Sequence, residues 1–412
     1  MQPSLQGTFV KHISILKNPV QKYAWGSRTA LQSLLGWPEP WKDPAAELWM
    51  GAHPKAPSKV QVDGQWRSLI DVIAADPVSI LGARAAVQFS NRLPFLFKVL
   101  AADRPLSIQV HPHTNGAREG FDRENRLTIP MGAPNRNYKD ASHKPECLCA
   151  VTRFEAMKGF RAPNEVLAMM NRVFTSTPLT ELDPLRKDPS AAGMKRFYSS
   201  LMGMEPARCT QVVKEAVKGA AENINVDRAF YWLLELNREY PGDVGVLSPL
   251  FLNLVKLSPG EAIYVPAGEL HAYLRGVGME IMASSDNVLR CGLTPKHVDI
   301  PELLKNVNFS TAPAKIQRPP LDVNFERVYK TPADEFQLSE IVLKNQETFR
   351  SETERSVEIL ICMEGSGMIE PSENGQEMSL SKGVSVIIPS AVPQYRISGN
   401  ITLYKGAVSK VQ

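Results

Sequence analysis

The amino-acid sequence predicts a mainly β fold with an α-helical insertion, built from more than one domain. The chain has 412 residues, whereas single hydrophobic cores stop growing near about 250–300 residues. Its 32 prolines exceed the usual share of about 5% and indicate many turns, which are typical of β-rich folds rather than helical bundles. A short β motif near residue 260 recurs near residue 383, which indicates two copies of one small β unit.

The composition is that of a globular chain. Hydrophobic residues make up 43% and charged residues 22%, which excludes a disordered or fibrous protein. The net charge of +4 is too small to indicate a nucleic-acid or anionic membrane partner, but it leaves room for a basic pocket that binds a phosphorylated small molecule. The most apolar stretch, 93–102, is too short to span a bilayer, and residues 1–16 lack the pattern of a signal peptide. We therefore expect a cytoplasmic protein.

The cysteines do not form a disulfide framework. There are five, and they are scattered: Cys147, Cys149, Cys209, Cys291 and Cys362. An odd, sparse set is typical of a reducing compartment. Cys147 and Cys149 form a C-x-C without a matching second pair, so we do not expect a zinc site made of thiolates.

The apolar pattern changes period along the chain. From 9 to 161 short apolar runs are broken by Pro, Gly and Asn; the runs 95–100 and 106–111 are predicted to be strands separated by a turn. From 163 to 240 apolar residues recur every three or four positions, which predicts helices. Strand-like patterning resumes at 251, and prolines at 301, 313, 319 and 320 indicate a linker.

The internal repeat decides the architecture of the β units. Residues 257–267 align without a gap with residues 380–390, and each copy predicts a glycine turn, a strand, a proline corner and a second strand. The first inward-facing residue of that second strand is His271 in one copy and Gln394 in the other. No acidic residue or histidine occurs from 388 to 397, so we expect the second copy to bind no metal, because zinc needs several N, S or carboxylate donors.

A few residues in the first copy and upstream of it suit a metal site. The chain has only seven histidines, and Gln109, His111 and His113 alternate, so on a strand they would share one face. The proline after His111 is expected to end that strand, which argues against His113. Glu146 and His271 could complete the site. Nitrogen and oxygen ligands without thiolate suit Zn²⁺ at a catalytic site with an open position, although Mn²⁺ or Fe²⁺ would also fit.

One motif resembles a known superfamily. The pattern Gly260-x5-Pro266-x-Gly268-x2-His271 is similar to the second motif of the cupins, whose β-barrels hold a metal with His and Glu ligands. It departs from that motif at Arg275, where cupins have Asn. The alternative is a surface turn with an ordinary hydrogen-bonded histidine.

The sequence as a whole resembles the type I phosphomannose isomerases. The resemblance is carried, in family order, by NPVQ (18–21), YAWGS (23–27), AELWMGAHP (46–54), PFLFKVL (94–100), PLSIQVHP (105–112), YKD (138–140), HKPE (143–146), SDNVLR (285–290) and GLTPK (292–296). The last hundred or so residues carry weaker signatures and depend mainly on the internal repeat.

The resemblance implies an aldose–ketose isomerase that interconverts mannose 6-phosphate and fructose 6-phosphate through an enediol-type intermediate, in mannose use and the supply of GDP-mannose precursor. It implies one Zn²⁺ per chain, held by Gln109, His111, Glu146 and His271. The family usually has an acidic or amide residue at the position of His113, so this histidine is not a predicted ligand.

The resemblance also implies the residues that act on substrate. Arg290 corresponds to the family's catalytic arginine, with a structural arginine on a loop as the alternative. The expected substrate-binding residues are Lys98, Ser107, Lys144, Tyr273, Glu280, Asp286 and Lys296. Lys144 and Glu280 are both candidates for proton transfer, and the sequence does not choose between them. A solvated surface lysine is the alternative for Lys296.

These expectations combine into one domain plan. Two cupin-type β-barrel (jelly-roll) domains are expected: a discontinuous catalytic, metal-binding one at 1–162 and 243–318, and a metal-free one at 319–412, with a helical insertion domain at 163–242. We expect a phosphosugar substrate, no nucleic-acid or membrane partner, and a monomer. A metal-dependent dioxygenase and a non-catalytic sugar-binding regulator are the alternatives from other classes; the phosphate-type cations argue against the first and the intact ligands with Arg290 against the second.

Overall fold

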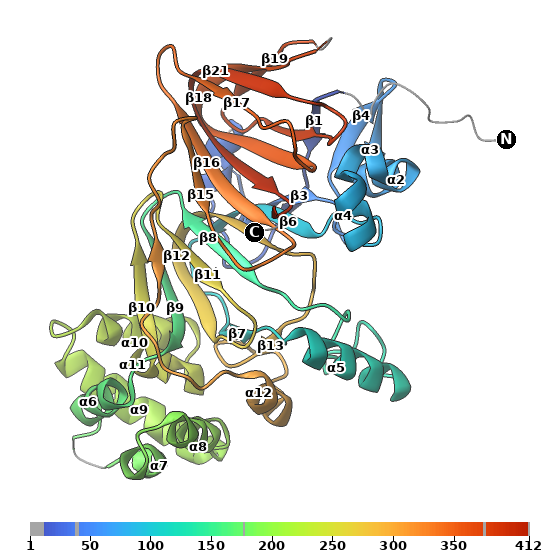
Figure 1. Cartoon of the computed structure of the whole chain (residues 1–412). Coiled ribbons are helices and arrows are strands. Elements are labelled where there is room, and N and C mark those ends of the chain that lie inside the picture. The colour runs from blue at the N-terminus through green and yellow to red at the C-terminus, as the bar shows by residue number, and fades with distance from the viewer. Residues whose placement is uncertain (1–11, 38–40, 176–177, 374–375, 411–412) are drawn as a thin grey trace.

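The protein, seen here as a computed structural model, is described over residues 12–37, 41–175, 178–373 and 376–410. Two antiparallel sheets lie one above the other, and a group of helices packs beneath the lower sheet (Figure 1). The predicted mainly β fold is confirmed. None of the described helices is both long and apolar enough to cross a bilayer.

The lower sheet carries the candidate site. Its described strands are β2 (Val20–Gln21), β3 (Glu47–Gly51), β6 (Phe95–Ala102), β7 (Gln109–Val110), β8 (Glu146–Ala150), β9 (Phe154–Phe160), β10 (Leu252–Leu257), β11 (Ala262–Val265), β12 (His271–Ala283), β13 (Leu289–Arg290) and β14 (Ile316–Gln317). Strand β12 is the centre of the sheet: residues 271–275 pair with β7 and β9, and residues 276–283 pair with β6 and β8.

The upper sheet joins both ends of the described chain. Its described strands are β1 (Ser14–Lys17), β4 (Lys59–Val62), β5 (Gln65–Ser68), β15 (Glu326–Tyr329), β16 (Gln337–Leu343), β17 (Thr348–Arg350), β18 (Glu358–Pro371), β19 (Met378–Ser381), β20 (Ser385–Ile388) and β21 (Tyr395–Ala407). Strand β1 pairs with β20, so part of the predicted segment 1–162 lies in the same sheet as the C-terminal strands.

Both sheets are open. The strand order runs from β14 to β2 in the lower sheet and from β15 to β5 in the upper sheet, with different strands at the two edges. The closed barrels expected from the family resemblance are therefore not what the strand pairings describe. The lower sheet divides at β12. The register of its pairing with β9 shifts between Tyr273 and Arg275, and from Gly276 onward the strand pairs with β6 and β8 instead.

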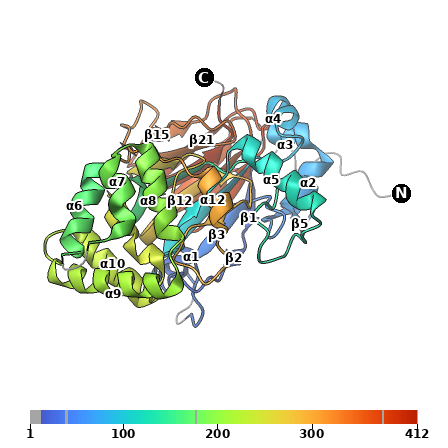
Figure 2. The same cartoon turned by 90° about the horizontal axis from the view of Figure 1, so that it is seen from below.

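Helices form between β9 and β10, as the periodicity predicts. They are α6 (Pro163–Val173), α7 (Asp183–Lys187), α8 (Ala191–Met202), α9 (Pro206–Glu222), α10 (Arg228–Glu239) and α11 (Ser248–Phe251), with 3₁₀ turns η2 (Thr180–Leu182) and η3 (Val244–Leu247). From below, α6–α10 gather on one side of the molecule (Figure 2). Their apolar faces share a core with Val110, Met157 and Leu289 of the lower sheet, so the helices support the strands that carry the site.

Other helices were not predicted. They are α1 (Ala30–Leu35), α2 (Leu69–Ala75), α3 (Pro77–Leu81), α4 (Ala83–Gln88), α5 (Thr114–Arg126) and α12 (Ile300–Asn306). Several have only five to seven residues, too few for a helical period to stand out. Pro301, predicted to mark a linker, instead lies in the first turn of α12, where proline is tolerated because its missing N–H would have no partner.

The internal repeat is confirmed in three dimensions. Strand β11 of the first copy corresponds residue for residue to β20 of the second, and Gly260 and Gly383 both have left-handed φ angles, of 81° and 86°. The strands that follow, β12 and β21, both have 13 residues. The predicted strand 106–111 is shorter in the structure, where only Gln109–Val110 pairs as β7.

Candidate metal centre and active-site pocket

The predicted ligands lie where strands of the lower sheet begin or end. Gln109 opens β7, Glu146 opens β8 and His271 opens β12. Gln109 pairs with His271 on one side and with Arg290 of β13 on the other, so strand register alone brings these three residues together. His111 follows β7 directly and is completely buried.

Three of these residues form a compact, buried cluster. The candidate ligand atoms of His111, Glu146 and His271 all lie within 4.8 Å of one another. His111 Nε2 lies 3.2 Å from Glu146 Oε1, and His271 Nε2 lies 3.3 Å from Glu146 Oε2. The spacing of the histidine motifs predicted this grouping; the geometry itself came only from the fold.

The histidine tautomers favour a cation between these atoms. His111 Nδ1 donates to the backbone carbonyl of Asn287 at 2.7 Å, and His271 Nδ1 donates to that of Glu269 at 3.0 Å. A carbonyl oxygen only accepts, so Nδ1 carries a proton in both rings, and in the neutral form of each ring Nε2 presents a lone pair. His111 Nε2 is buried without a hydrogen-bond partner. Two lone pairs facing a carboxylate are the donor set expected for a zinc ligand cluster.

The charge states of the cluster also suit a metal. Burial, reinforced by the charge of Lys144, lowers the pKa of His111 to about 4, which keeps its ring neutral near neutral pH. Although burial disfavours a charged carboxylate, Lys144 and His111 lower the pKa of Glu146 well below its usual range. Neutral imidazole and ionised carboxylate are the forms that bind a metal.

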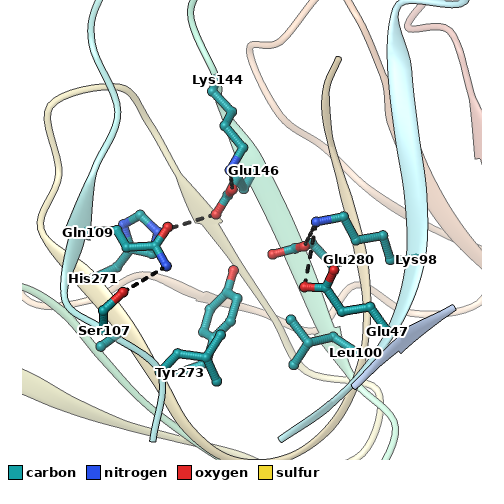
Figure 3. Close-up of a pocket in the computed structure, with 12 residues that line it drawn as sticks. Glu47, Lys98, Leu100, Ser107, Gln109, Lys144, Glu146, His271, Tyr273 and Glu280 are labelled. Carbon is teal, nitrogen blue, oxygen red and sulfur yellow. Dashed lines mark hydrogen bonds and ion pairs between the residues drawn. The ribbon is translucent and has the colours of Figure 1, made fainter. Parts of the chain in front are cut away.

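A pocket opens beside this cluster (Figure 3). It is lined by Glu47, Lys98, Leu100, Leu106, Ser107, Gln109, Lys144, Glu146, His271, Ala272, Tyr273 and Glu280. Gln109 Nε2 lies 3.5 Å from Ser107 Oγ, a contact that leaves the carboxamide oxygen of Gln109 free to act as a ligand. Lys144 Nζ lies 2.9 Å from Glu146 Oε1. Eight predicted ligand or substrate residues line this pocket. Six of them lie on strands β6, β7, β8 and β12, and Ser107 and Lys144 lie two residues before β7 and β8.

Two glutamates and one lysine face the ligand cluster across the pocket (Figure 3). Lys98 Nζ lies 2.9 Å from Glu280 Oε2 and 3.9 Å from Glu47 Oε1. Burial raises the pKa of Glu280, whereas Glu280 and Glu47 more than offset the effect of burial on Lys98 and raise its pKa. The hydroxyl of Tyr273 is buried without a hydrogen-bond partner, between this wall and Gln109 in Figure 3.

The predicted ligand His111 and three predicted catalytic or substrate-binding residues lie outside the pocket lining. Arg290 is half-buried beside Gln109 in the sheet. Lys296 is exposed, and the nearby charge of Arg290 lowers its pKa, so the two cations share one region. Asp286 forms an ion pair of 2.9 Å with Lys55 and lies 3.6 Å from His53.

Some residues of the site were not predicted from the sequence. Glu47 lines the pocket and accepts a hydrogen bond from Trp49 Nε1 at 2.6 Å. Asn287 and Glu269 orient the histidines through their carbonyls. Glu47 and Asn287 stand inside the motifs that carry the family resemblance, which is the signal that could have identified them. A backbone contact such as that of Glu269 leaves no such signal.

The remaining histidines near the site have other partners. His113 is the exposed residue before α5 and is outside the cluster of three ligands. His143 Nε2 lies 2.6 Å from Glu335 Oε1, which joins the segment before β8 to the segment before β16. That His113 is not a ligand stays a prediction.

Comparison with known proteins identifies the family. Residues 13–163 match the catalytic domain of type I phosphomannose isomerases, and residues 326–407 match the cupin domain of mannose-6-phosphate isomerases. The chain is 42% identical over 390 residues to mannose-6-phosphate isomerase of Escherichia coli K12, covering 93% of this chain and 97% of that protein. It is 32% identical over 427 aligned residues to the enzyme of Mus musculus, covering 94% and 90% of the two chains.

Solved structures agree along nearly the whole chain. A crystal structure of a point mutant of phosphomannose isomerase from Salmonella typhimurium superposes with a TM-score of 0.89 at 39% identity, covering 97% of this chain and all of that one. A zinc-bound crystal structure of a mannose 6-phosphate isomerase superposes with a TM-score of 0.88 at 38% identity, with the same 97% coverage of this chain. The chain therefore belongs to the type I phosphomannose isomerase family and is an isomerase.

Proposed function

We propose that the protein is a zinc-dependent aldose–ketose isomerase that interconverts mannose 6-phosphate and fructose 6-phosphate through an enediol-type intermediate. One observation supports this most directly. His111, Glu146 and His271 present a buried donor set in the forms that bind zinc, and the same pocket holds Lys98, Glu280 and Tyr273. A zinc-bound relative of the same fold is consistent with this donor set.

The ligand set we propose is Gln109, His111, Glu146 and His271, with one zinc ion per chain. Bound there, the metal would supply Lewis-acid stabilisation of negative charge on substrate oxygens. Gln109 completes the set because it pairs with His271 and lines the same pocket.

The proton transfer between C1 and C2 needs a group that can gain and lose a proton inside the pocket. Glu280 suits this role because burial raises its pKa, which brings the carboxyl closer to the range in which it can shuttle protons. Lys98, 2.9 Å away, neutralises the carboxylate whenever it is ionised. Lys144 is the second candidate, but its ammonium is already paired with Glu146 at 2.9 Å. We favour Glu280 as the base.

The other predicted residues would bind the two ends of the substrate. Tyr273 has a free buried hydroxyl that could bond a sugar hydroxyl. Arg290 and Lys296 share one region outside the pocket wall, and their combined charge suits a phosphate or the developing enediolate. Ser107 would contribute a hydroxyl between them and Gln109. Asp286, held by Lys55, would position this edge of the site.

The broader assignments follow from the same proposal. We propose two jelly-roll units of cupin type, at 1–162 with 243–318 and at 319–412, interrupted by a helical insertion at 163–242. Strands β1, β4 and β5 pair in the upper sheet, which favours moving them to the second unit. We further propose a cytoplasmic monomer that supplies the mannose 6-phosphate from which GDP-mannose is made.

A coupled isomerase assay on the purified protein tests the proposal. Mannose 6-phosphate is the substrate, and the fructose 6-phosphate formed is converted by added enzymes to a product read by NADP⁺ reduction. We expect turnover that EDTA abolishes and Zn²⁺ restores. Turnover unaffected by EDTA would contradict the zinc site, and binding of mannose 6-phosphate without turnover would instead indicate a sugar-binding regulator. Oxygen consumption with a sugar substrate would indicate a dioxygenase.

A further inference from the structure

The backbone carbonyl that orients His111 belongs to a residue whose side chain is itself the centre of a buried network. Asn287 is completely buried, and its carbonyl oxygen accepts the hydrogen bond from His111 Nδ1. The side chain of Asn287 forms hydrogen bonds not with His111 but with a different segment, 139–142. The ligand and the segment before β8 are therefore linked through one residue.

The carboxamide of Asn287 is fully used. Its Oδ1 accepts from the backbone N–H of Lys139 at 2.7 Å and of Asp140 at 3.2 Å. Its Nδ2 donates to the carbonyls of Asp140 and Ser142, both at 2.8 Å. Nδ2 also lies 3.2 Å from Asp140 Oδ1, so both N–H groups and the oxygen of the carboxamide have partners.

Asp140 closes the network from the other side. Its carboxylate accepts from the hydroxyl of Ser285 at 2.9 Å, from the backbone N–H of Asp286 at 2.8 Å and from that of Ser142 at 2.9 Å. The segments 139–142 and 285–287 are thus bonded to each other in both directions. We call this pair of side chains with their bonds the Asn287–Asp140 clasp.

The clasp joins two segments that each lead to candidate site residues. Segment 139–142 leads to Lys144 and Glu146, and segment 285–287 leads to Arg290. Neither Asn287 nor Asp140 lines the pocket. The clasp is linked to the ligand cluster by the hydrogen bond between the Asn287 carbonyl and His111.

We propose that Asn287 and Asp140 are positioning residues that hold His111 as the Nδ1-protonated tautomer and fix its Nε2 opposite Glu146. In this way the clasp sets the metal affinity of the cluster. The inference rests on the proposed zinc site. Partners that orient a ligating histidine typically contribute about 10–100-fold in metal affinity, because a ring free to rotate or to change tautomer presents its lone pair only part of the time.

Zinc affinity of the full-length protein, measured by competition with a chromophoric chelator, tests this directly. Asn287→Ala should bind zinc about 10–100-fold more weakly than wild type. Asn287→Asp should also bind more weakly, because its added oxygen would face the carbonyls of Asp140 and Ser142. Asp140→Asn keeps the size of the side chain and should give a smaller loss, which keeps the test available if Asn287→Ala fails to fold.

Asn306→Ala is the matched control. Asn306 is also buried, and its Nδ2 donates to Tyr138 Oη and to the carbonyl of Glu302, both at 2.9 Å; within the described part of the chain, its side chain forms no hydrogen bond with a candidate ligand. It should lower the unfolding temperature as the Asn287 variants do and leave zinc affinity within about twofold of wild type. ¹⁵N NMR of the zinc-free protein should show the His111 ring protonated on Nδ1 in wild type and a mixture of tautomers in Asn287→Ala.

The possible outcomes distinguish a failure of the clasp proposal from a failure of the zinc-site proposal. Wild-type zinc affinity in both Asn287→Ala and Asp140→Asn would overturn the proposed role of the clasp but not the zinc site. An equal loss of affinity in Asn306→Ala would also overturn that role, because it would indicate general destabilisation. A wild-type protein that binds no zinc would overturn the proposed site, and with it the role of the clasp.

Discussion

At the scale of single residues, the candidate ligands act as a unit because each histidine already has one ring nitrogen bonded to a carbonyl. Nothing but the remaining nitrogen is left to face Glu146, and burial keeps water from competing for it. Removal of one member leaves the others with unpaired buried charge or lone pairs.

This unit gives the first prediction. His271→Ala should lose bound metal, because it removes one of the nitrogen donors next to Glu146. His113→Ala should keep it, because His113 lies outside the cluster. Metal content after gel filtration, measured by elemental analysis, checks both variants. A loaded His271→Ala together with an empty His113→Ala would reverse the ligand assignment.

A second residue-scale prediction separates the two cations. Arg290→Ala should lower kcat by about 10²–10³ while zinc stays bound, since removal of one group that stabilises transition-state charge typically costs this much. Lys296→Ala should mainly raise KM, by about tenfold, as expected for a phosphate contact at the exposed edge. Steady-state kinetics with metal analysis tests both, and near-normal kcat in Arg290→Ala would remove its catalytic assignment.

Only some of the candidate ligands could be predicted from strand periodicity. The alternation of Gln109 and His111 and the repeat position of His271 follow from strand periodicity, but the amide ligand depends on the family resemblance. The tautomers could not be predicted, because they depend on carbonyls of Asn287 and Glu269 that only the folded backbone brings into contact with the rings.

At the scale of elements, the two copies of the repeat differ at the positions of the candidate ligands. Glu358 pairs with the last residue of β20 as Glu146 pairs with the last residue of β11, so an acidic residue does stand in the second copy at the register of the ligand. The sequence window 388–397 did not include it, because it comes from another strand. The expectation that the second copy has no acidic residue at the candidate metal position is therefore wrong.

Two cations stand beside this acid. Arg355 Nη1 lies 3.4 Å and Lys405 Nζ lies 3.3 Å from the carboxylate of Glu358. Arg355 also donates to the carbonyl of Val392, the residue that corresponds to Glu269. A guanidinium thus bonds the carbonyl that would orient a histidine, and Gln394 bonds the carbonyl of Ser351 instead, at 2.7 Å.

The third prediction follows from this replacement. Gln394→Ala should leave zinc content and kcat almost unchanged. Arg355→Ala should lower the free energy of unfolding by about 3–5 kcal/mol, because it leaves Glu358 buried with less compensation, and should not change zinc content. Urea unfolding and elemental analysis measure both effects. Loss of metal in Gln394→Ala would show that the second copy takes part in the metal site.

At the scale of the whole molecule, the two sheets share one core. Phe97 and Ile281 of the lower sheet belong to the same apolar cluster as Ile359, Ile361 and Tyr404 of the upper sheet. The helices share another cluster with β7, β9 and β13. The pocket is therefore set in a lower sheet that is supported from both sides.

The fourth prediction tests the contact between the two sheets by removing one hydroxyl group. Tyr329 Oη, from the upper sheet, donates to the carbonyl of Gly260 at 2.9 Å and accepts from Cys149 Sγ at 3.2 Å in the lower sheet. Tyr329→Phe should lower the free energy of unfolding by about 1–3 kcal/mol, because both buried partners lose a bond. Zinc content and kcat should not change. Unchanged stability would show that the contact does not contribute to holding the sheets together.

The order of β and helical regions along the chain could be predicted from the sequence, but the long-range strand pairing could not. Composition, the change of period at Pro163 and the repeat predict a β protein with inserted helices. The pairing of β1 with β20 could not be predicted, because residues 14 and 387 are joined only by tertiary packing. The division of β12 between two sets of partner strands likewise depends on strands far apart in the sequence, so no local pattern predicts it.

The central claim is that one zinc ion per chain, held by the His111–Glu146–His271 cluster, makes the isomerase active. Titration of zinc into metal-free protein, with bound metal and isomerase activity measured on the same samples, tests it most directly. We expect activity to rise in proportion to bound zinc and to reach its plateau at one zinc per chain. Full activity without metal, or a plateau only at two zinc ions per chain, would contradict it.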